Sequence, residues 1–249
     1  MTKRTVAIVL FTLSTSLPAL AVSEWDIEPP TRTETVDPAS SRVIWGPTAL
    51  PNVRKGVRAT AFNLGLWDFG FQVNDQATIG LQGVPPFGIL VAGTAFRFTT
   101  SINPKLHLGV YGQGGMVSYL FKSSNDSAYY YGGGPILTIG DHRAAINIAM
   151  LNYGGHTGRR SGYAVVPNVG VSVSMAKHMK FNVEMFSFNA PRSDRWGKAW
   201  AVLYGLRFFG SGGSFFGDVS FVIPVYRKTS KILEYAPLGI PLLAFGFSF

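Results

Sequence analysis

The sequence predicts an all-β protein: a transmembrane, antiparallel, up-and-down β-barrel of about twelve strands. Three observations lead to this prediction. Apolar and polar residues alternate with period two in many short segments, as in strands with one apolar face. Charged residues are only 14% of the chain, against roughly 25% in soluble domains, while hydrophobic residues reach 47%. Beyond residue 21 no stretch approaches about 18 unbroken apolar residues, so strands must cross the membrane.

The first 21 residues have the features of a secretory signal peptide. Lys3 and Arg4 form a short positive region, residues 6–13 are apolar, and residues 19–21 supply the small residues that a signal peptidase reads. An N-terminal membrane anchor is the alternative, but Ser, Thr and Pro interrupt the apolar run. We therefore expect export and a mature chain that begins at Val22. That chain has no cysteine, so packing and backbone hydrogen bonds must hold it together.

The mature chain divides into two parts. Residues 22–41 are polar, contain three prolines and show no periodicity, which predicts a flexible periplasmic lead-in. Residues 42–249 alternate in segments separated by turns, which predicts the barrel. From residue 74 onward short breaks alternate with longer ones, including one around 154–162. Short periplasmic turns and longer extracellular loops are typical of outer-membrane barrels.

The number of strands follows from the breaks. Eleven segments with strand character lie between residues 57 and 249, the first at 57–73. A barrel whose two ends face the same side needs an even number of strands. We assign the missing strand to residues 42–50, which gives twelve. Ten strands is the alternative, if residues 42–50 form only a plug or lead-in.

The alternation also predicts which charged side chains point into the lumen. Five of them lie within about five residues of a short turn and should form a charged layer in the periplasmic half: Asp68, Arg97, Glu184, Arg207 and Asp218. Arg58, Gln72, His107 and Lys180 share the inward face. Arg207 and Asp218 belong to one hairpin, so we expect them to form an ion pair. The layer either neutralises itself and holds the barrel together, or filters small solutes, or forms a catalytic site.

No catalytic or metal-binding pattern is visible in the sequence. Three of the four histidines (His107, His142 and His178) lie in or next to short turns without a matching partner. The fourth, His156, is near Ser161 but has no carboxylate in its segment. The histidines lack metal-ligand spacing, and the glycine clusters follow no strand-to-helix turn. We therefore expect neither an enzyme nor a cofactor nor a metal site.

Positive charge gathers in the longer breaks, within a chain of formal net charge +9. The predicted basic rim consists of Arg159, Arg160, Arg192, Arg195, Lys198, Arg227 and Lys228. At the extracellular side of a barrel these side chains would meet the phosphates of lipopolysaccharide. We therefore expect outer-membrane lipid and lipopolysaccharide as partners rather than nucleic acid.

The chain ends in a strand-like run, residues 245–249, in which three phenylalanines share one face and small residues the other. Through Gly246, Phe247 and Phe249 this end resembles the C-terminal signal by which Gram-negative outer-membrane β-barrel proteins are recognised for assembly. The mature chain as a whole resembles a small barrel of that kind. The resemblance implies an outer-membrane location and insertion by the barrel assembly machinery.

A barrel of this size does not by itself identify a function, because channels, lipid enzymes, adhesins and structural proteins share the architecture. The sequence favours a narrow passive channel for small polar or anionic solutes. The alternative is a non-conducting structural or adhesion barrel whose lumen is closed by ion pairs.

Overall fold

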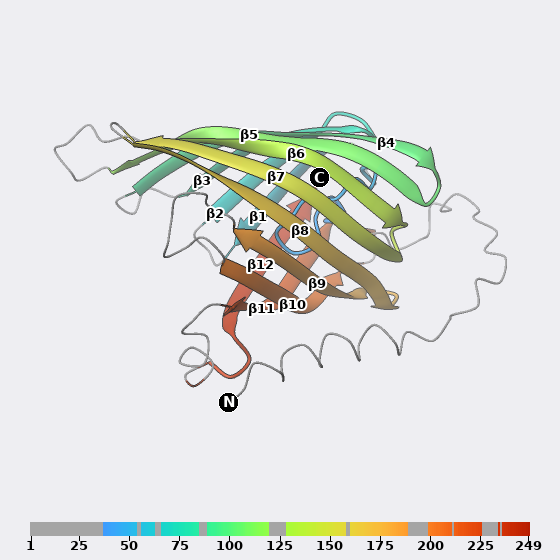
Figure 1. The fold of residues 1–249 in the computed structure, drawn as a ribbon. Coiled ribbons are helices and arrows are strands. Elements are labelled where there is room, and N and C mark those ends of the chain that lie inside the picture. The colour runs from blue at the N-terminus through green and yellow to red at the C-terminus, as the bar shows by residue number, and fades with distance from the viewer. Residues whose placement is uncertain are drawn as a thin grey trace. The chain divides into compact units, whose positions relative to one another are not determined.

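The computed structural model describes residues 37–53, 56–62, 66–84, 89–119, 128–157, 160–188, 199–210, 212–225, 234 and 236–249. Within them twelve antiparallel strands close into a barrel, and each strand pairs with its neighbours in sequence (Figure 1). The predicted fold class and strand number are confirmed. Among the described residues, no helix has the length and apolar character needed to cross a membrane.

The strands differ in length. They are β1 (Gly56–Phe62), β2 (Leu66–Gln72), β3 (Ala77–Val84), β4 (Ile89–Asn103), β5 (Leu106–Tyr119), β6 (Ala128–Gly140), β7 (Ala144–Thr157), β8 (Arg160–Ala176), β9 (Met179–Phe188), β10 (Ala199–Phe209), β11 (Phe215–Val225) and β12 (Ile240–Ser248). Strands β4 to β8 have 13 to 17 residues and the others 7 to 11, so one wall of the barrel is taller, as Figure 1 shows.

The first strand is not the predicted one. Residues 42–50 form only an isolated bridge between Arg42 and Pro47, because a proline in the segment cannot donate to a strand ladder. The segment expected as one strand, 57–73, is instead two strands that pair with each other, with Phe62 opposite Leu66. The two errors cancel, and the count of twelve is right.

The long break expected around residues 154–162 is also wrong. β7 continues to Thr157 and β8 begins at Arg160, which is its partner. The glycines in this stretch are strand residues that make room for aromatic rings: a Cβ on Gly154 would lie 2.4 Å from the ring of Tyr131 on β6.

The two faces of the strands differ sharply in exposure. On β7, Ile146, Ile148 and Met150 are 47%, 44% and 47% exposed, whereas Asn147 and Ala149 between them are 1% and 2% exposed. The outer face is therefore apolar and the inner face is packed. An apolar outer face with all backbone groups paired in a closed sheet is what a β-structure needs in order to cross a lipid bilayer.

The last strand closes the barrel against the first. The amide of Phe249 donates to the carbonyl of Val57 at 2.8 Å, and the amide of Val57 donates back at 3.2 Å. Gly56 makes this approach possible, because its φ is +134° and a Cβ there would lie 2.0 Å from the Phe249 carbonyl oxygen. The side chains of Phe247 and Phe249 are 45% and 78% exposed on the outer face.

The facing of the strands predicts the effect of new charges. Val219→Arg places a cation on the outer face at the middle of β11, where Val219 is 45% exposed. We expect a loss of about 2–4 kcal/mol in the free energy of unfolding in lipid vesicles. Gln82→Arg, on the inner face of β3, should cost clearly less. Equal losses for the two variants in urea titrations would show that the facing is wrong.

Candidate functional site

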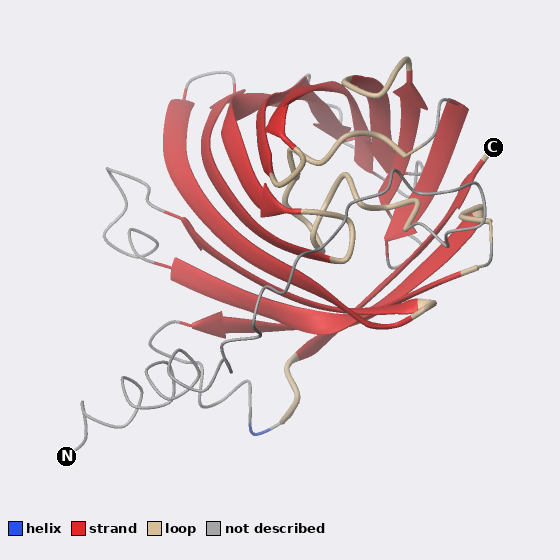
Figure 2. Ribbon diagram, turned by 90° about the vertical axis from the view of Figure 1, so that its right-hand side faces the viewer, coloured by secondary structure: helices blue, strands red, loops and turns tan. Residues whose placement is uncertain are grey.

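The lumen is filled over part of its length by residues 37–52, which we call the plug. In Figure 1 the plug is the blue segment inside the ring of strands, and Figure 2 shows loop segments within the same ring. Every residue from 37 to 50 is buried except Trp45. The segment turns back on itself through a bond from the Val43 amide to the Gly46 carbonyl, 3.0 Å, and one from Thr48 to Ser41, 2.9 Å. Residues 37–41 therefore do not belong to a flexible lead-in, and residues 22–36 lie outside the described part of the chain.

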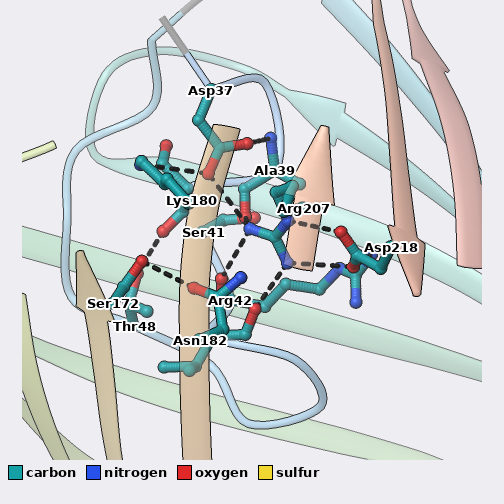
Figure 3. A network of polar contacts seen from close by, with 12 residues as sticks. Asp37, Ala39, Ser41, Arg42, Thr48, Ser172, Lys180, Asn182, Arg207 and Asp218 are labelled. Carbon is teal, nitrogen blue, oxygen red and sulfur yellow. Dashed lines mark hydrogen bonds and ion pairs between the residues drawn. The ribbon is translucent and has the colours of Figure 1, made fainter. Parts of the chain in front are cut away.

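Arg207, on β10, is the main anchor of the plug (Figure 3). Its guanidinium forms a bidentate pair with Asp218 on β11, Nε to Oδ1 at 2.7 Å and Nη2 to Oδ2 at 3.1 Å. The remaining donors reach plug carbonyls: Ala39 at 2.9 Å, Arg42 at 3.2 Å and Val43. The planar guanidinium thus holds the barrel wall and the plug backbone at once. The side chain is only 1% exposed.

Two plug residues extend this pair into a row of alternating charges. Asp37 lies between Lys180 and Arg207, with Oδ2 at 3.1 Å from each cation, and Arg42 reaches Asp218 at 3.0 Å. Burial raises the pKa of Asp37, but the charges of Arg207 and Lys180 outweigh it and hold the pKa well below its usual range. Three cations therefore share two carboxylates, and each carboxylate bridges plug and wall (Figure 3).

Glu184, on β9, binds the tip of the plug without a cation. Its carboxylate accepts from the backbone amides of Ile44 at 3.0 Å, Trp45 at 2.7 Å and Gly46 at 2.6 Å. Asn168 on β8 donates to the same carboxylate at 2.5 Å. Successive amides that converge on one anion form a nest. Gly46 is required here, because a Cβ would lie 2.3 Å from Glu184 Oε1.

Strands β4 and β7 hold the second half of the plug by its carbonyls. Arg97 on β4 donates to Thr48 O at 2.9 Å and Leu50 O at 2.8 Å, and also bonds Asn52. Asn147 on β7 donates to the Pro47 carbonyl at 2.8 Å. The plug is thus fixed mainly by side chains of the wall that form hydrogen bonds with its backbone.

The structure places the five predicted lumen residues as follows. Arg97, Glu184, Arg207 and Asp218 line the lumen and bond the plug, and the expected Arg207–Asp218 pair is confirmed. Asp68 instead pairs with Arg58 at 3.4 Å. Of the predicted basic rim, Arg160 begins β8; Arg159, Arg192, Arg195, Lys198, Arg227 and Lys228 lie outside the described residues.

Sequence reasoning missed Asp37 and Arg42, because they lie in a segment without periodicity. A signal was present. The inward positions of the strands carry four permanent cations, Arg58, Arg97, Lys180 and Arg207, against the three carboxylates Asp68, Glu184 and Asp218. Buried cations need partners, so an additional carboxylate had to come from outside the strands.

A cavity of about 630 Å³ lies between the plug and the ends of the strands that are remote from the short turns. Its lining changes character around the barrel. Strands β1 to β6 contribute hydrogen-bonding groups, namely Arg58, Asp68, Gln82, Arg97, Tyr111, Gln113 and Tyr130. Strands β7 to β12 contribute mainly apolar groups, namely Leu151, Val166, Phe186, Leu203, Val222 and Leu242. Trp45, at the tip of the plug and 53% exposed, faces the same space.

The apolar half of the cavity was also missed. The signal for it is that β10 to β12 are apolar on both faces, for example Leu242 next to Leu243, where a water-filled lumen would require polar residues on one face. Inward Leu203 packs with plug residues Val43 and Ile44. Strand β10 is therefore apolar where it meets the side chains of the plug, next to the polar contacts that Glu184 makes with the plug backbone.

Comparisons with known proteins add little to this picture. No protein-family model and no curated protein matches the chain. Among solved structures it is similar to a "Bacterial polysaccharide outer membrane secretin", with a TM-score of 0.46 and 11% identity over 80% of this chain and 78% of that chain. The closed antiparallel barrel, its apolar outer face and its charged inner face define the class: an outer-membrane-type transmembrane β-barrel.

Removal of the main anchor should loosen the plug. Arg207→Ala leaves Asp37 and Asp218 with fewer cations and strips three plug carbonyls of their donor. We expect trypsin to cleave after Arg42 in the folded variant in detergent, at a rate at least tenfold above wild type, with cleavage mapped by mass spectrometry. Lys177→Ala, in an exposed turn, is the control. An Arg42 site that stays protected in Arg207→Ala would contradict the anchoring role.

His142, in the turn between β6 and β7, gives a prediction about pH. Burial, with the nearby Lys180 charge, lowers its pKa from 6.5 to about 4, against the opposing effects of Asp37 and Asp141, and Nδ1 is buried without a hydrogen-bond partner. The unfolded chain therefore takes up this proton first as the pH falls.

The contribution of His142 to the free energy of unfolding is therefore fully present above about pH 6.5. It is lost as the pH falls toward 4, by up to roughly 3 kcal/mol. His142→Gln should remove that part of the acid sensitivity. Denaturant titrations of both proteins between these pH values measure the difference, and parallel pH profiles would contradict it.

Proposed function

We propose that this protein is an outer-membrane barrel that its own plug keeps closed, so that it conducts no current at rest. The observation that carries the proposal is the burial of the plug backbone across the lumen, where Arg97, Glu184 and Arg207 each bond it. This arrangement favours the closed barrel over the open channel that the charged inner face first suggests.

A passive channel is the second candidate, and it requires the plug to leave. One observation favours it: among the described residues the plug makes no strand pairing with the wall. Ion pairs and hydrogen bonds with wall side chains hold it instead. The wall left behind would carry Arg58, Arg97, Lys180 and Arg207 against three carboxylates. A narrow, low-dielectric path with that excess favours small anions.

Single-channel recording in planar bilayers tests the proposal. The wild type should be silent, and deletion of residues 37–52 should give open events with anion preference. Arg207→Ala combined with Glu184→Gln should give intermittent openings, because the plug then loses its anchor and its tip contact. A steady wild-type conductance equal to that of the deletion would overturn the proposal.

The outer membrane, with insertion by its barrel assembly machinery and lipopolysaccharide around the rim, is the proposed setting. The signal-peptide features of residues 1–21, the terminal aromatic run and the apolar outer face support it. Phe247→Ser combined with Phe249→Ser should leave the chain in the periplasm in a protease-sensitive form. Normal outer-membrane yield and heat-modifiable gel mobility of this variant would contradict the proposed role of Gly246, Phe247 and Phe249.

We propose no enzymatic role, cofactor or metal. His156 Nδ1 lies 2.9 Å from Ser161 Oγ, and His107 Nδ1 lies 2.8 Å from Ser101 Oγ. Neither histidine is hydrogen-bonded to a carboxylate among the described residues, although a base that activates serine needs a group to orient it. In the same part of the chain no cluster of three or more potential metal ligands occurs.

A further inference from the structure

We propose that the cavity above the plug binds one small amphiphile that has a single carboxylate or similar anionic head and an apolar chain. The inference goes beyond the closed barrel and rests on it only in that the plug forms the cavity floor. A volume of about 630 Å³ falls within the roughly 300–1,000 Å³ of sites for drug-sized ligands. The space therefore suits one single-chain molecule.

The split lining argues for an amphiphile. Six apolar side chains, each from a different strand between β7 and β12, line one side of the cavity, with Tyr153 and Asn168 as the polar residues among them. The other side, from β1 to β6, presents hydrogen-bonding groups that the fold keeps in place. Tyr111 donates to Gln113 Oε1 at 2.6 Å. The hydroxyl of Tyr130 lies against the backbone of Gly93, where a Cβ would come within 2.3 Å of it. A ligand that fills the cavity must be apolar at one end and polar at the other.

Charge decides the sign of the head group. The ionic side chains of the described lumen, all buried except the half-buried Asp68, are five cations (Arg42, Arg58, Arg97, Lys180 and Arg207) and four carboxylates (Asp37, Asp68, Glu184 and Asp218), a difference of one positive charge. Arg97 has no ion pair with a carboxylate in the described part of the chain; its bonds go to carbonyls and to Asn52. Arg58 meets Asp68 only at 3.4 Å. Both arginines line the cavity.

The two arginines that line the cavity also carry buried donors without partners. The Nε groups of Arg58 and Arg97 are buried without a hydrogen-bond partner, and both side chains are at least nine-tenths buried, at 6% and 4% exposed. Buried donors without a hydrogen-bond partner are rare and unfavourable in folded proteins. An anionic head group beside these two side chains would supply the negative charge that the lumen lacks.

Trp45 provides a built-in reporter, because it stands at the plug tip in the cavity lining. We would titrate the full-length barrel in nanodiscs with brominated dodecanoate and record tryptophan quenching. Subtraction of the Trp45→Phe variant isolates the signal of Trp45 from quenching of tryptophans by bromine in the lipid. The expected result is saturable, Trp45-dependent quenching, at least tenfold weaker for brominated dodecanol and for brominated dodecylammonium.

Two pairs of variants test the location of the site. Val222→Phe with Leu242→Phe fills the apolar half and should abolish saturable quenching. The matched control is Val219→Phe with Leu243→Phe on the same two strands, because both residues face outward, at 45% and 52% exposed, and it should bind as wild type does. Arg58→Gln should weaken dodecanoate about tenfold and leave dodecanol unchanged.

Non-saturable quenching, equal affinity for the neutral and anionic probes, or equal losses in the two double variants would overturn the inference. Its failure is distinguishable from that of the closed barrel. A silent wild type without Trp45-dependent quenching contradicts only the binding site, whereas a conducting wild type contradicts the plug.

Discussion

The structure depends on one constraint: the buried guanidinium of Arg207 must have all its donors satisfied. Asp218, across one hairpin, accepts from Nε and Nη2 of Arg207. The other guanidinium donors need acceptors that the strands do not offer. Plug carbonyls and Asp37 supply them. An unpaired buried charge costs several kcal/mol, so a wall with this arginine demands a segment in the lumen. Glu184 is under the same constraint, because its carboxylate is satisfied by plug amides and Asn168 rather than by a cation.

The plug in turn gives the barrel its two compartments. Toward the short turns, charged and polar side chains of the wall grip the plug backbone, and little space remains: a void beside Lys180 and Asp37 holds only about 10 Å³. Away from them, the plug tip becomes the floor of an amphipathic cavity. Arg58 and Arg97 belong to both compartments, because each bonds the plug and lines the cavity. A ligand at the floor would therefore add to the forces that keep the plug in place, and loss of the plug would remove the binding site.

Period-two alternation was enough to predict the fold class and the facing of the strands, because a barrel wall has only two environments. It placed Arg207 opposite Asp218 for the same reason. It offered a plug only as the alternative for residues 42–50, since residues 37–52 follow no period and their structure depends on contacts with distant strands. Local signals also misled where glycine was taken for a break: Gly154 lies inside β7 to accommodate Tyr131. The amphipathic cavity could not be predicted without the plug. The apolar inward residues of β10 to β12 line a cavity only because the plug closes one end of it.

The central claim is that residues 37–52 lie inside the lumen, and a disulfide tests it directly, because the chain has no native cysteine. A Cβ on Gly170 of β8 would lie 3.2 Å from Cβ of Val43 in the plug, close to the roughly 3.5–4.5 Å that a disulfide needs. Val43→Cys with Gly170→Cys should therefore cross-link within the folded barrel under mild oxidation, detected by mass spectrometry of the digested chain. Val43→Cys with Leu243→Cys, whose second position faces outward, should not. Absence of the first cross-link in folded protein would contradict the account.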